Sequence, residues 1–526
     1  MAWVAAVWLL LTAATLWWLP RNDLPNGFQN EYAHLYTLTE VHFRIRDEGL
    51  DAARSSLWDG YYPPAPHGVA SAVLHATGGD RVEATASSAV WLLLWLAGTA
   101  ALGRMLAGPS AGAFAVGLLA GWPSVFGTVR RYEPNAALAA CVAAAGALLV
   151  SGLGNRRHAA AFGILAGLGM LSDRLVFAVY LAPLALLALV RPRPAERPRL
   201  VAALAVGLAL CGWFYVRWFS IHLPEVLTQL GGEITRAGEQ TGAFPAWTPV
   251  GLAWYPLAFV DRMMGLGPGV IALGGLIAWG LHGRKRVEPA LRGRFELFLF
   301  GGLLLITAVS KKQPFYAIPL LAPLAAAVGA AWTGMVRGPR IAVAVAVAGL
   351  GLAQLLALTA FVFVVPRPLS GFPLFPSGLL GHEYTQAAPP HRQDLGVDRI
   401  ASICRDQTAE RPYTMVFSDA HGAYEGQLMP TLRLALDTRL VEGVLMAGEA
   451  VADQEIHAGC FVFVTDADER WPTPEMVTTL FEPWGLGDPS SNLLQALAAM
   501  EARSRLLERW DAGTGEAVFV YAIAPP

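Results

Sequence analysis

Charged residues at the ends of long apolar runs are the first candidates for chemistry in this sequence. Charge close to the hydrocarbon layer of a membrane is unfavourable, so residues that keep it there are functional candidates by default. Three carboxylates have this setting, namely Glu31, Glu133 and Asp173. Five cations share it, and they are Arg130, Arg131, Arg174, Lys311 and Lys312. Cations bind phosphate oxygens, and a carboxylate can accept a proton from an attacking hydroxyl. The composition therefore predicts a site for an anionic headgroup.

Each of these residues also has a structural explanation that the sequence leaves open. Asn30 and Glu31 are residue types expected at a helix cap and in its first turn. Glu133 suits a helix N-terminus in the same way. Asp173 can simply neutralise Arg174, and long basic side chains often only reach out to lipid headgroups.

Polar residues of the first long loop are candidates for binding the substrate. His34 follows Glu31 by three residues, so on a helix it would lie one turn away and could share its proton network, although a lone histidine usually has no special role. Asp59 and Tyr62 precede a Pro-Pro pair in the same loop. We therefore expect Asn30, His34, Asp59 and Tyr62 to contact the substrate.

Histidines and cysteines give no metal signature. His67 and His75 are weaker candidates than His34, and no spacing of His or Cys in the chain is typical of a zinc site. The chain is therefore predicted to hold no metal through such ligands.

The composition indicates what must position these residues. Of the 526 residues, 55% are hydrophobic and 15% are charged, whereas roughly a quarter of an ordinary soluble domain is charged. A protein that is soluble throughout is excluded, because apolar runs near the length of a membrane span recur up to Val365. We expect about eleven spans, at residues 2–19, 88–106, 110–127, 134–153, 159–172, 174–190, 200–219, 263–282, 295–310, 314–332 and 341–365.

Charge divides the chain into two parts. Residues 1–365 carry 27 basic and 18 acidic side chains, a net charge of +9, whereas residues 366–526 carry 11 and 22, a net charge of −11. The predicted fold is a polytopic α-helical membrane domain, residues 1–365, followed by a soluble α/β domain, residues 366–526. A Pro-rich linker at the start of the second part supports this boundary.

The distribution of Lys and Arg predicts the orientation. Fourteen of these residues fall in the connections that face the cytoplasm if the first loop faces outward, against eight in the outer connections after residue 88. The first loop, residues 20–87, and the C-terminal domain are then periplasmic in a bacterial inner membrane. The candidate charged residues all belong to the outer face in this topology.

The long first loop contains two helical patterns. After Asn30, a stripe that includes Leu35, Tyr36 and Phe43 predicts an amphipathic helix lying on the outer leaflet. A second helix is expected at about residues 66–76. Together these helices could cap a cavity above the spans, and loops held by a rigid scaffold often carry function.

The C-terminal domain is predicted to hold a mixed or parallel sheet with covered faces. Strands are expected at 413–417, 460–465 and 517–523, and helices at 397–404, 432–440 and 493–510. Cys404 and Cys460 both lie in this domain, and an outward orientation would permit a disulfide between them. Cys141 and Cys211 fall inside spans, where we expect them to be packing residues.

The order of several motifs resembles a known family. Glu31 follows the first span, and a Tyr-Pro-Pro element stands at 62–64 in the first outer loop. Arg-Tyr-Glu-Pro-Asn-Ala-Ala-Leu-Ala-Ala occupies 131–140, Gly-Leu-Gly-Met-Leu-Ser-Asp-Arg occupies 167–174, and Lys-Lys-Gln-Pro-Phe-Tyr-Ala-Ile-Pro-Leu-Leu-Ala-Pro-Leu-Ala occupies 311–325. This order, over about residues 1–365, resembles the polyprenyl-phosphate-dependent membrane glycosyltransferases of the GT-C fold, which include protein O-mannosyltransferases and the lipid A aminoarabinose transferase.

The resemblance implies roles for individual residues. The family's catalytic acid follows the first span, usually in an Asp-Glu pair, and Asn30-Glu31 stands there, so Glu31 alone would be the base. Glu133 would orient the acceptor or hold a cation. The cations would hold the lipid phosphate, and they are Arg130, Arg131, Arg174, Lys311 and Lys312.

The resemblance also implies a reaction. An acceptor hydroxyl or amine attacks the anomeric carbon of a polyprenyl-phosphate sugar, and a single displacement with one base inverts the stereochemistry. The acceptor is a glycan, a lipid or a protein, membrane lipids surround the chain, and nothing points to nucleic acid. No cofactor is certain, and a divalent metal, Mg²⁺ or Mn²⁺, is an option that Asn30 disfavours.

Two other functions fit part of the pattern. A transporter or flippase of a lipid-linked anion would also need cations at the outer face. Carboxylates at the outer edge, rather than at the membrane midplane on broken helices, weigh against it. A catalytically inactive scaffold is the third reading, and a change of Glu31 alone would separate the enzyme from both.

Overall fold

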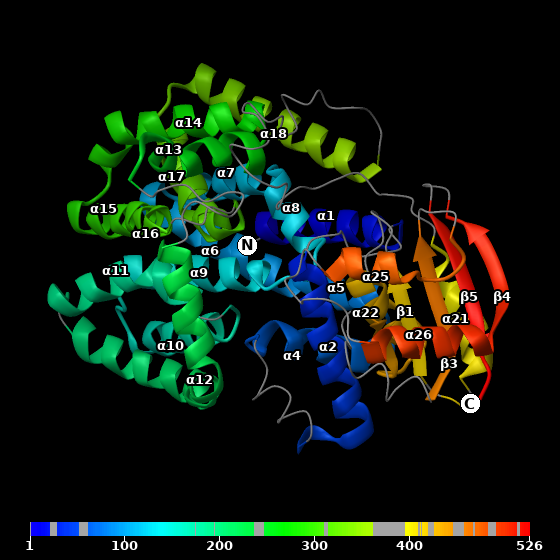
Figure 1. The fold of residues 1–526 in the computed structure, drawn as a ribbon. Helices are drawn as coiled ribbons and strands as arrows, with labels where there is room; N and C mark the ends of the chain where they lie inside the picture. Colours follow the sequence, from blue (N-terminus) through cyan, green and yellow to red (C-terminus); the bar gives the residue numbers. More distant parts are fainter. Residues whose placement is uncertain are drawn as a thin grey trace. The chain divides into compact units, whose positions relative to one another are not determined.

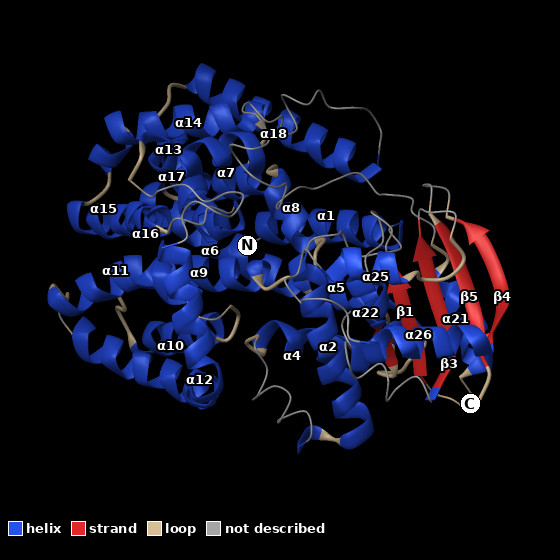
Figure 2. Ribbon diagram, viewed as in Figure 1, coloured by secondary structure: helices blue, strands red, loops and turns tan. Residues whose placement is uncertain are grey.

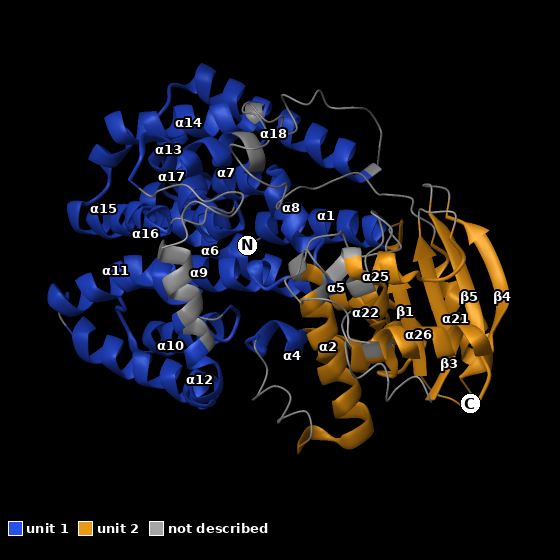
Figure 3. Cartoon of the chain, viewed as in Figure 1, with its two compact units in different colours: residues 1–19, 54–69, 85–390 blue, residues 20–53, 70–84, 391–526 orange. Residues whose placement is uncertain are grey.

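The computed structural model shows two compact units (Figure 3). Unit 1 comprises residues 1–19, 54–69 and 85–390, and unit 2 comprises residues 20–53, 70–84 and 391–526. The residues that the structure describes are 2–21, 29–51, 62–173, 175–193, 195–235, 247–309, 314–360, 395–408, 411, 413–418, 425–444, 457–465, 469–481, 491–512 and 516–525. The predicted boundary at residue 365 and the Pro-rich linker lie outside them.

Unit 1 is built from helices (Figures 1 and 2). Its first half contains α1 Ala2–Trp18, α6 Ser88–Ala107, α7 Pro109–Ala120, α8 Pro123–Val129, α9 Asn135–Ser151, α10 Arg156–Met170, α11 Val176–Val190 and α12 Glu196–Thr235, with the 3₁₀ turn η1 Leu19–Arg21 after α1. Its second half contains α13 Pro249–Ala258, η2 Phe259–Met263, α14 Leu266–Leu281, η3 Gly283–Arg286, α15 Pro289–Glu296, η4 Leu297–Gly301, α16 Gly302–Ala308, η5 Pro314–Leu320, α17 Leu321–Thr333 and α18 Arg337–Ala360. Each of the eleven predicted apolar runs overlaps one, two or three of these helices.

The count of eleven spans is not confirmed. Among the described residues, five helices are long and apolar enough to cross a membrane, or six if a bent pair is one span. That pair is α7 and α8, which bend by 70° at a break. The bend follows from Pro123, because the residue before a proline avoids the helical region, and Trp122 is accordingly extended at φ −84° and ψ 127°.

Small residues let the helices of unit 1 approach closely. A Cβ added at Gly98 of α6 would lie 2.8 Å from the backbone of Ala143 in α9, and one at Gly163 of α10 would lie 2.5 Å from the carbonyl of Ala203 in α12. Backbones in close contact are typical of helix packing in membranes, where van der Waals contact drives association. The Ala-rich helix α9 is buried along almost its entire length, so it forms the centre of the unit.

A buried ion pair joins three helices of unit 1. Arg294 of α15 is paired with Glu196 of α12, with Nη2 2.5 Å from Oε2, and both side chains are at most 5% exposed. Nη1 of Arg294 also donates to the carbonyl of Leu149 near the end of α9, at 3.2 Å. The guanidinium therefore satisfies one buried carboxylate and one helix-terminal carbonyl together.

Unit 2 holds a five-stranded mixed sheet in the order β2-β1-β3-β5-β4. The strands are β1 Tyr413–Ser418, β2 Val441–Gly443, β3 Ala458–Thr465, β4 Ser504–Asp511 and β5 Ala517–Ile523. β1 is parallel to β2 and β3, while β5 is antiparallel to β3 and β4. The described helices of the unit are α2 Gln29–Glu48, α5 Arg81–Ala86, α21 Val397–Gln407, α22 Glu425–Ala435, α25 Pro474–Phe481 and α26 Ser491–Arg503, and α4 Ala65–Thr77 begins in unit 1 and ends in unit 2.

The sheet is covered on both faces. Val462 and Val464 of β3 belong to one apolar cluster, and Phe461 and Phe463 belong to another. Successive side chains of a strand face opposite sides, so both faces of β3 are buried and the strand reads as a continuous apolar run. The predicted mixed sheet and its three predicted strands are confirmed to within two residues.

Two predictions for the C-terminal domain need correction. The helix expected at 493–510 ends at Arg503, and residues 504–511 form β4 instead. The segment contains Leu, Arg and Glu, which favour helix locally, but its backbone pairs with β5, and such pairing overrides local propensity. The helix expected at 432–440 starts earlier, as α22, and residues 441–443 form the strand β2, which was not predicted.

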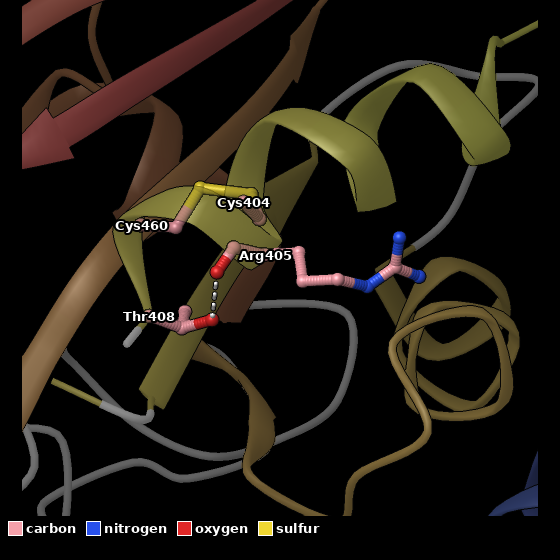
Figure 4. Close-up of a disulfide and its surroundings, with 4 residues drawn as sticks. All are labelled: Cys404, Arg405, Thr408 and Cys460. Atoms are coloured by element: carbon pink, nitrogen blue, oxygen red, sulfur yellow. Dashed lines mark hydrogen bonds between the residues drawn. A yellow bond between two sulfur atoms is a disulfide. The ribbon is translucent and has the colours of Figure 1, made fainter. Parts of the chain in front are cut away.

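A disulfide joins Cys404 of α21 to Cys460 of β3, with their Cα atoms 5.4 Å apart (Figure 4). Both sulfur-bearing residues are buried in the apolar cluster on one face of the sheet. The pairing that the sequence permits is thus confirmed. Cys141 and Cys211 are buried and free, as expected of packing residues.

The two helices predicted in the first loop are confirmed as α2 and α4, but the surroundings of α2 differ from the prediction. Leu35, Leu38 and Phe43 are almost completely buried within the protein. Tyr36 packs against the apolar cluster that contains the disulfide. The apolar stripe of α2 therefore contacts protein, and the predicted location on the outer leaflet is wrong. Hydrophobic periodicity does not distinguish a protein partner from a lipid one.

The buried pair in unit 1 yields the first prediction. Arg294→Ala leaves the Glu196 carboxylate buried without its cation, and we expect the free energy of unfolding to fall by about 3 kcal/mol. Thermal unfolding in detergent measures it. The double change Glu196→Leu with Arg294→Met should recover most of the loss, since an apolar pair replaces two buried charges. Equal stability of Arg294→Ala and the unmodified protein would show that the pair is not needed.

Candidate functional site

The loop between α8 and α9 carries charged side chains into the interior of unit 1. α8 ends at Val129, and the N–H of the capping residue Arg130 donates to the carbonyl of Phe126. α9 starts after Pro134, whose carbonyl accepts from the N–H of Leu138. Proline suits this position because it has no N–H to leave unpaired at a helix start. Three residues lie between Arg130 and Pro134, and the side chains of all three are buried: Arg131, Tyr132 and Glu133.

Glu133 has close polar neighbours. Its Oε2 accepts a hydrogen bond from Nδ2 of Asn135 at 2.6 Å. Burial raises the pKa of the Glu133 carboxyl, the charge of Arg131 and the bond from Asn135 act in the opposite direction, and the nearby carboxylate of Asp173 raises the pKa further. Burial and a like charge thus outweigh one cation and one donor, which brings the proton affinity of this carboxyl above that of an exposed glutamate.

Three loops of unit 1 meet around this carboxyl. Nδ1 of His67 and the hydroxyl of Tyr132 are 3.0 Å apart, and both side chains are buried. The N–H of Ala65, at the start of α4, donates to the carbonyl of Leu171 at 2.9 Å. The segment at the start of α4 therefore contacts the loop of Glu133 on one side and the loop of Asp173 on the other.

Arg130 contacts several helices of unit 1. Its guanidinium donates to the carbonyl of Leu358 at 2.8 Å and to the hydroxyl of Thr359, near the end of α18. It also lies over the rings of Trp18 and Phe126, at 5.2 and 5.1 Å from their centroids. These contacts give Arg130 a structural task in joining α1, α8 and α18.

The remaining predicted cations lie outside the described residues, and they are Arg174, Lys311 and Lys312. The elements that follow them are described and are tied together. Tyr180 of α11 donates from its hydroxyl to the carbonyl of Tyr316 in η5. The segment after residue 174 and the segment after residue 312 therefore contact each other within unit 1.

Glu31 and His34 belong to unit 2. Glu31 lies in the first turn of α2, His34 follows one turn later, and both side chains are buried. The expectation that Glu31 converges with Glu133 stays a prediction. Asn30 lies in α2, but its side chain is outside the described part, as is Asp59, while Tyr62 is half-buried.

The described residues offer few ligands for a divalent metal. Glu133 and Asp173 are two carboxylates, and the bond from the Asn135 amide occupies one oxygen of Glu133. Within the described ranges no group of three His, Cys, Asp or Glu side chains gathers around one point. Hard divalent cations need several oxygen ligands, so we route no step through a metal.

The sequence indicates the charged residues of the site, but it does not indicate which residues are hydrogen-bonded to one another there. Asn135 and Tyr132 stand within the motif at 131–140, but their types alone do not say what they contact. His67 was ranked as a weak candidate because it is an isolated histidine. Its contact with Tyr132, 65 residues further along the chain, is visible only in the structure. No local sequence pattern indicates a contact over that separation.

The contact between His67 and Tyr132 predicts a pH dependence of stability. Burial lowers the pKa of His67 from 6.5 to about 3, so between these values the unfolded chain binds a proton that the folded chain does not. Stability is complete above pH 6.5 and falls as the pH is lowered. Between pH 7 and pH 5, His67 should cost the folded state about 2 kcal/mol. His67→Gln, which does not titrate, should show a smaller drop in thermal midpoint over this range, and an identical drop would contradict the assignment.

Comparison with known proteins adds two findings. The model of a family described as dolichyl-phosphate-mannose-protein mannosyltransferase matches residues 62–215. No curated protein matches the sequence. The matched segment contains α4, the loop of Glu133 and the loop of Asp173, which are the three parts that meet in unit 1.

Solved structures of ArnT share the fold of this chain. ArnT from Cupriavidus metallidurans bound to undecaprenyl phosphate is similar with a TM-score of 0.57 and 16% identity, covering 97% of each chain. The apo state of ArnT from the same organism is similar with a TM-score of 0.55 and 15% identity, covering 98% of each chain. The comparison with the oligosaccharyltransferase AglB from Archaeoglobus fulgidus gives a TM-score of 0.47 and 12% identity, covering 99% of this chain and 74% of AglB. This chain therefore shares the fold of ArnT along nearly its whole length, and residues 62–215 match the mannosyltransferase family model.

Proposed function

We propose that this chain transfers a sugar from a polyprenyl-phosphate donor to an acceptor at the periplasmic face of a bacterial inner membrane. The observation that carries the proposal is the buried cluster around Glu133, because it places a cation and two carboxylates where three loops of a GT-C fold meet. ArnT, which shares this fold, is described as bound to undecaprenyl phosphate. A lipid phosphate is the kind of ligand that such cations bind.

The reaction is a single displacement in which atoms and charges balance. An acceptor hydroxyl or amine attacks the anomeric carbon, the bond from that carbon to the phosphate oxygen breaks, and the polyprenyl phosphate leaves with the electron pair. Glu31 takes the proton of the acceptor. With one base and no covalent nucleophile the configuration at the anomeric carbon inverts.

The cations stabilise the leaving phosphate. Arg131 is the described candidate, since it lies beside Glu133 and its charge acts on that carboxyl. Arg174, Lys311 and Lys312 complete the set by their positions in the sequence, next to elements that contact each other. Arg130 supports the site by anchoring α18. Substitution of a cation in the set should weaken donor binding more than turnover.

Glu133 acts on the acceptor rather than as the base. Its Oε2 is already engaged by Asn135 and its carboxyl is close to Arg131, so it is fixed and suited to orienting an acceptor hydroxyl or ammonium group. His34, one turn after Glu31, shares the proton network of the base. Asn30, Asp59 and Tyr62 contribute to binding the sugar or the acceptor.

The disulfide supports the proposed orientation. Disulfides persist in oxidising compartments such as the periplasm and are rare in the cytosol. The bond between Cys404 and Cys460 is buried in the core of the C-terminal domain, which supports the proposal that this domain is periplasmic. The excess of Lys and Arg in the loops predicted to face the cytoplasm supports the same orientation.

The direct test is Glu31→Gln. A general base contributes about 10²–10⁴-fold to a rate, so we expect a loss of turnover in this range and a nearly unchanged KM for the donor, because the phosphate contacts remain. The purified protein is assayed for release of polyprenyl phosphate from a panel of lipid-phosphate sugars, with products identified by mass spectrometry.

Glu48→Gln is the matched control. Glu48 ends the same helix, is exposed, and pairs with Arg439, so its substitution removes one charge from α2 without touching the site. Full activity of Glu31→Gln would remove Glu31 as the base. Donor binding without release, even by the unmodified protein, would overturn the transferase and favour a transporter of the same lipid.

A further inference from the structure

We propose that Arg433 of the C-terminal domain is a positioning residue for catalysis, because it fixes the helix that carries Glu31. The inference rests on the proposed role of Glu31 as base. It assigns a task to the C-terminal domain, which is to support the helix that carries the proposed base.

Arg433 lies in α22 and is 1% exposed. Its Nε donates to the carbonyl of Val441 in β2 at 3.0 Å. Its Nη1 lies 3.2 Å from Oε2 of Glu40 and 3.5 Å from Oγ1 of Thr39. The guanidinium carbon also lies 4.4 Å from the centre of the Tyr36 ring. One side chain thus joins α22, β2 and α2.

The partners of Arg433 on α2 form one face of that helix. Tyr36, Thr39 and Glu40 are spaced by three and four residues, which places them next to each other on a helix surface. A planar guanidinium can bind an anion along its edge while it stacks on a ring. The contact therefore fixes both the rotation of α2 about its axis and its position along the axis.

Glu31 is coupled to this face through the helix itself. It precedes Glu40 by nine residues, which corresponds to about 14 Å along an α-helix. Hydrogen bonds within α2 make this stretch rigid, so a rotation at Tyr36 and Glu40 would carry Glu31 with it. A shift of about 1 Å in a catalytic group can lower a rate about 10²-fold.

The position of Arg433 depends on the hydrophobic core of the C-terminal domain. Leu428 and Leu432 of α22 are fully buried in the cluster that also contains Cys404 and Cys460, and Tyr36 packs against the same cluster. Arg433 directly follows Leu432, so the packing of α22 determines where its guanidinium lies. The disulfide and the sheet thereby support the position of α2.

Two more exposed ion pairs connect α2 to the segment between α22 and β2. Arg46 of α2 pairs with Asp437, and Arg439 pairs with Glu48. Exposed pairs are screened by solvent and contribute little. Arg439 is 34% exposed where Arg433 is 1% exposed, so the two arginines form a matched pair that differs in burial.

The experiment compares Arg433→Gln with Arg439→Gln in the full-length protein, by steady-state kinetics and by hydrogen exchange of α2. We expect Arg433→Gln to lower kcat at least tenfold, to leave the KM for the donor within twofold, to shift the acid limb of the pH profile, and to speed exchange at residues 29–40. Arg433→Lys should recover part of kcat, because it restores the charge but not the planar contacts. Arg439→Gln should match the unmodified protein.

An unchanged kcat and pH profile in folded Arg433→Gln would overturn the inference. Should that variant fail to fold, Arg433→Lys and Glu40→Gln decide in the same way, since each weakens the contact while it keeps most of the packing. Glu31→Gln, assayed in parallel, separates the two proposals. If it is inactive while Arg433→Gln is fully active, only the positioning role is wrong. If it is fully active, the base assignment is wrong whatever Arg433 does.

Discussion

Buried charge must find a partner, and this constraint organises the chain. A charged group that is removed from water without a partner is strongly destabilising. Arg294 and Glu196 satisfy each other between helices of unit 1, and Arg433 meets Glu40 inside unit 2. Glu133 has a donor and a cation beside it, but also a second carboxylate. The incompletely balanced group is the one that the proposed function uses, which is the usual relation between perturbed groups and active sites.

The second feature of the fold is that segments distant in sequence build one unit. α2 comes from the first loop, yet it belongs to the same compact unit as the C-terminal sheet. The helix thereby gains a rigid support that a loop over a membrane surface would lack, and precise positioning of a catalytic group requires such support. In this account the C-terminal domain, its buried disulfide and Arg433 act together to hold Glu31 in place.

The sequence predicted much of the fold from periodicity. Helices appear at every predicted apolar run, α2 and α4 lie where the stripes predict them, and the strands at 413 and 517 start as expected. The pattern could not give the partner of α2, because an apolar stripe is the same against lipid or protein. Arg433 could not be found either, since its partner Glu40 lies 393 residues away and no local signal marks a long-range contact. The local pattern predicts a helix where β4 lies, because the pairing of β4 with β5 is likewise not visible in a local pattern.

The central claim is that Glu31 is the base of a lipid-phosphate-dependent transfer and that cations near Glu133 bind the phosphate. The most direct measurement is an experimental structure of the full-length protein with bound polyprenyl phosphate. The account predicts that the phosphate oxygens lie within about 3 Å of a cation from the set of Arg131, Arg174, Lys311 and Lys312, and that the Glu31 carboxylate faces that phosphate group. A phosphate bound elsewhere, or bound there with Glu31 turned away from it, would contradict the account.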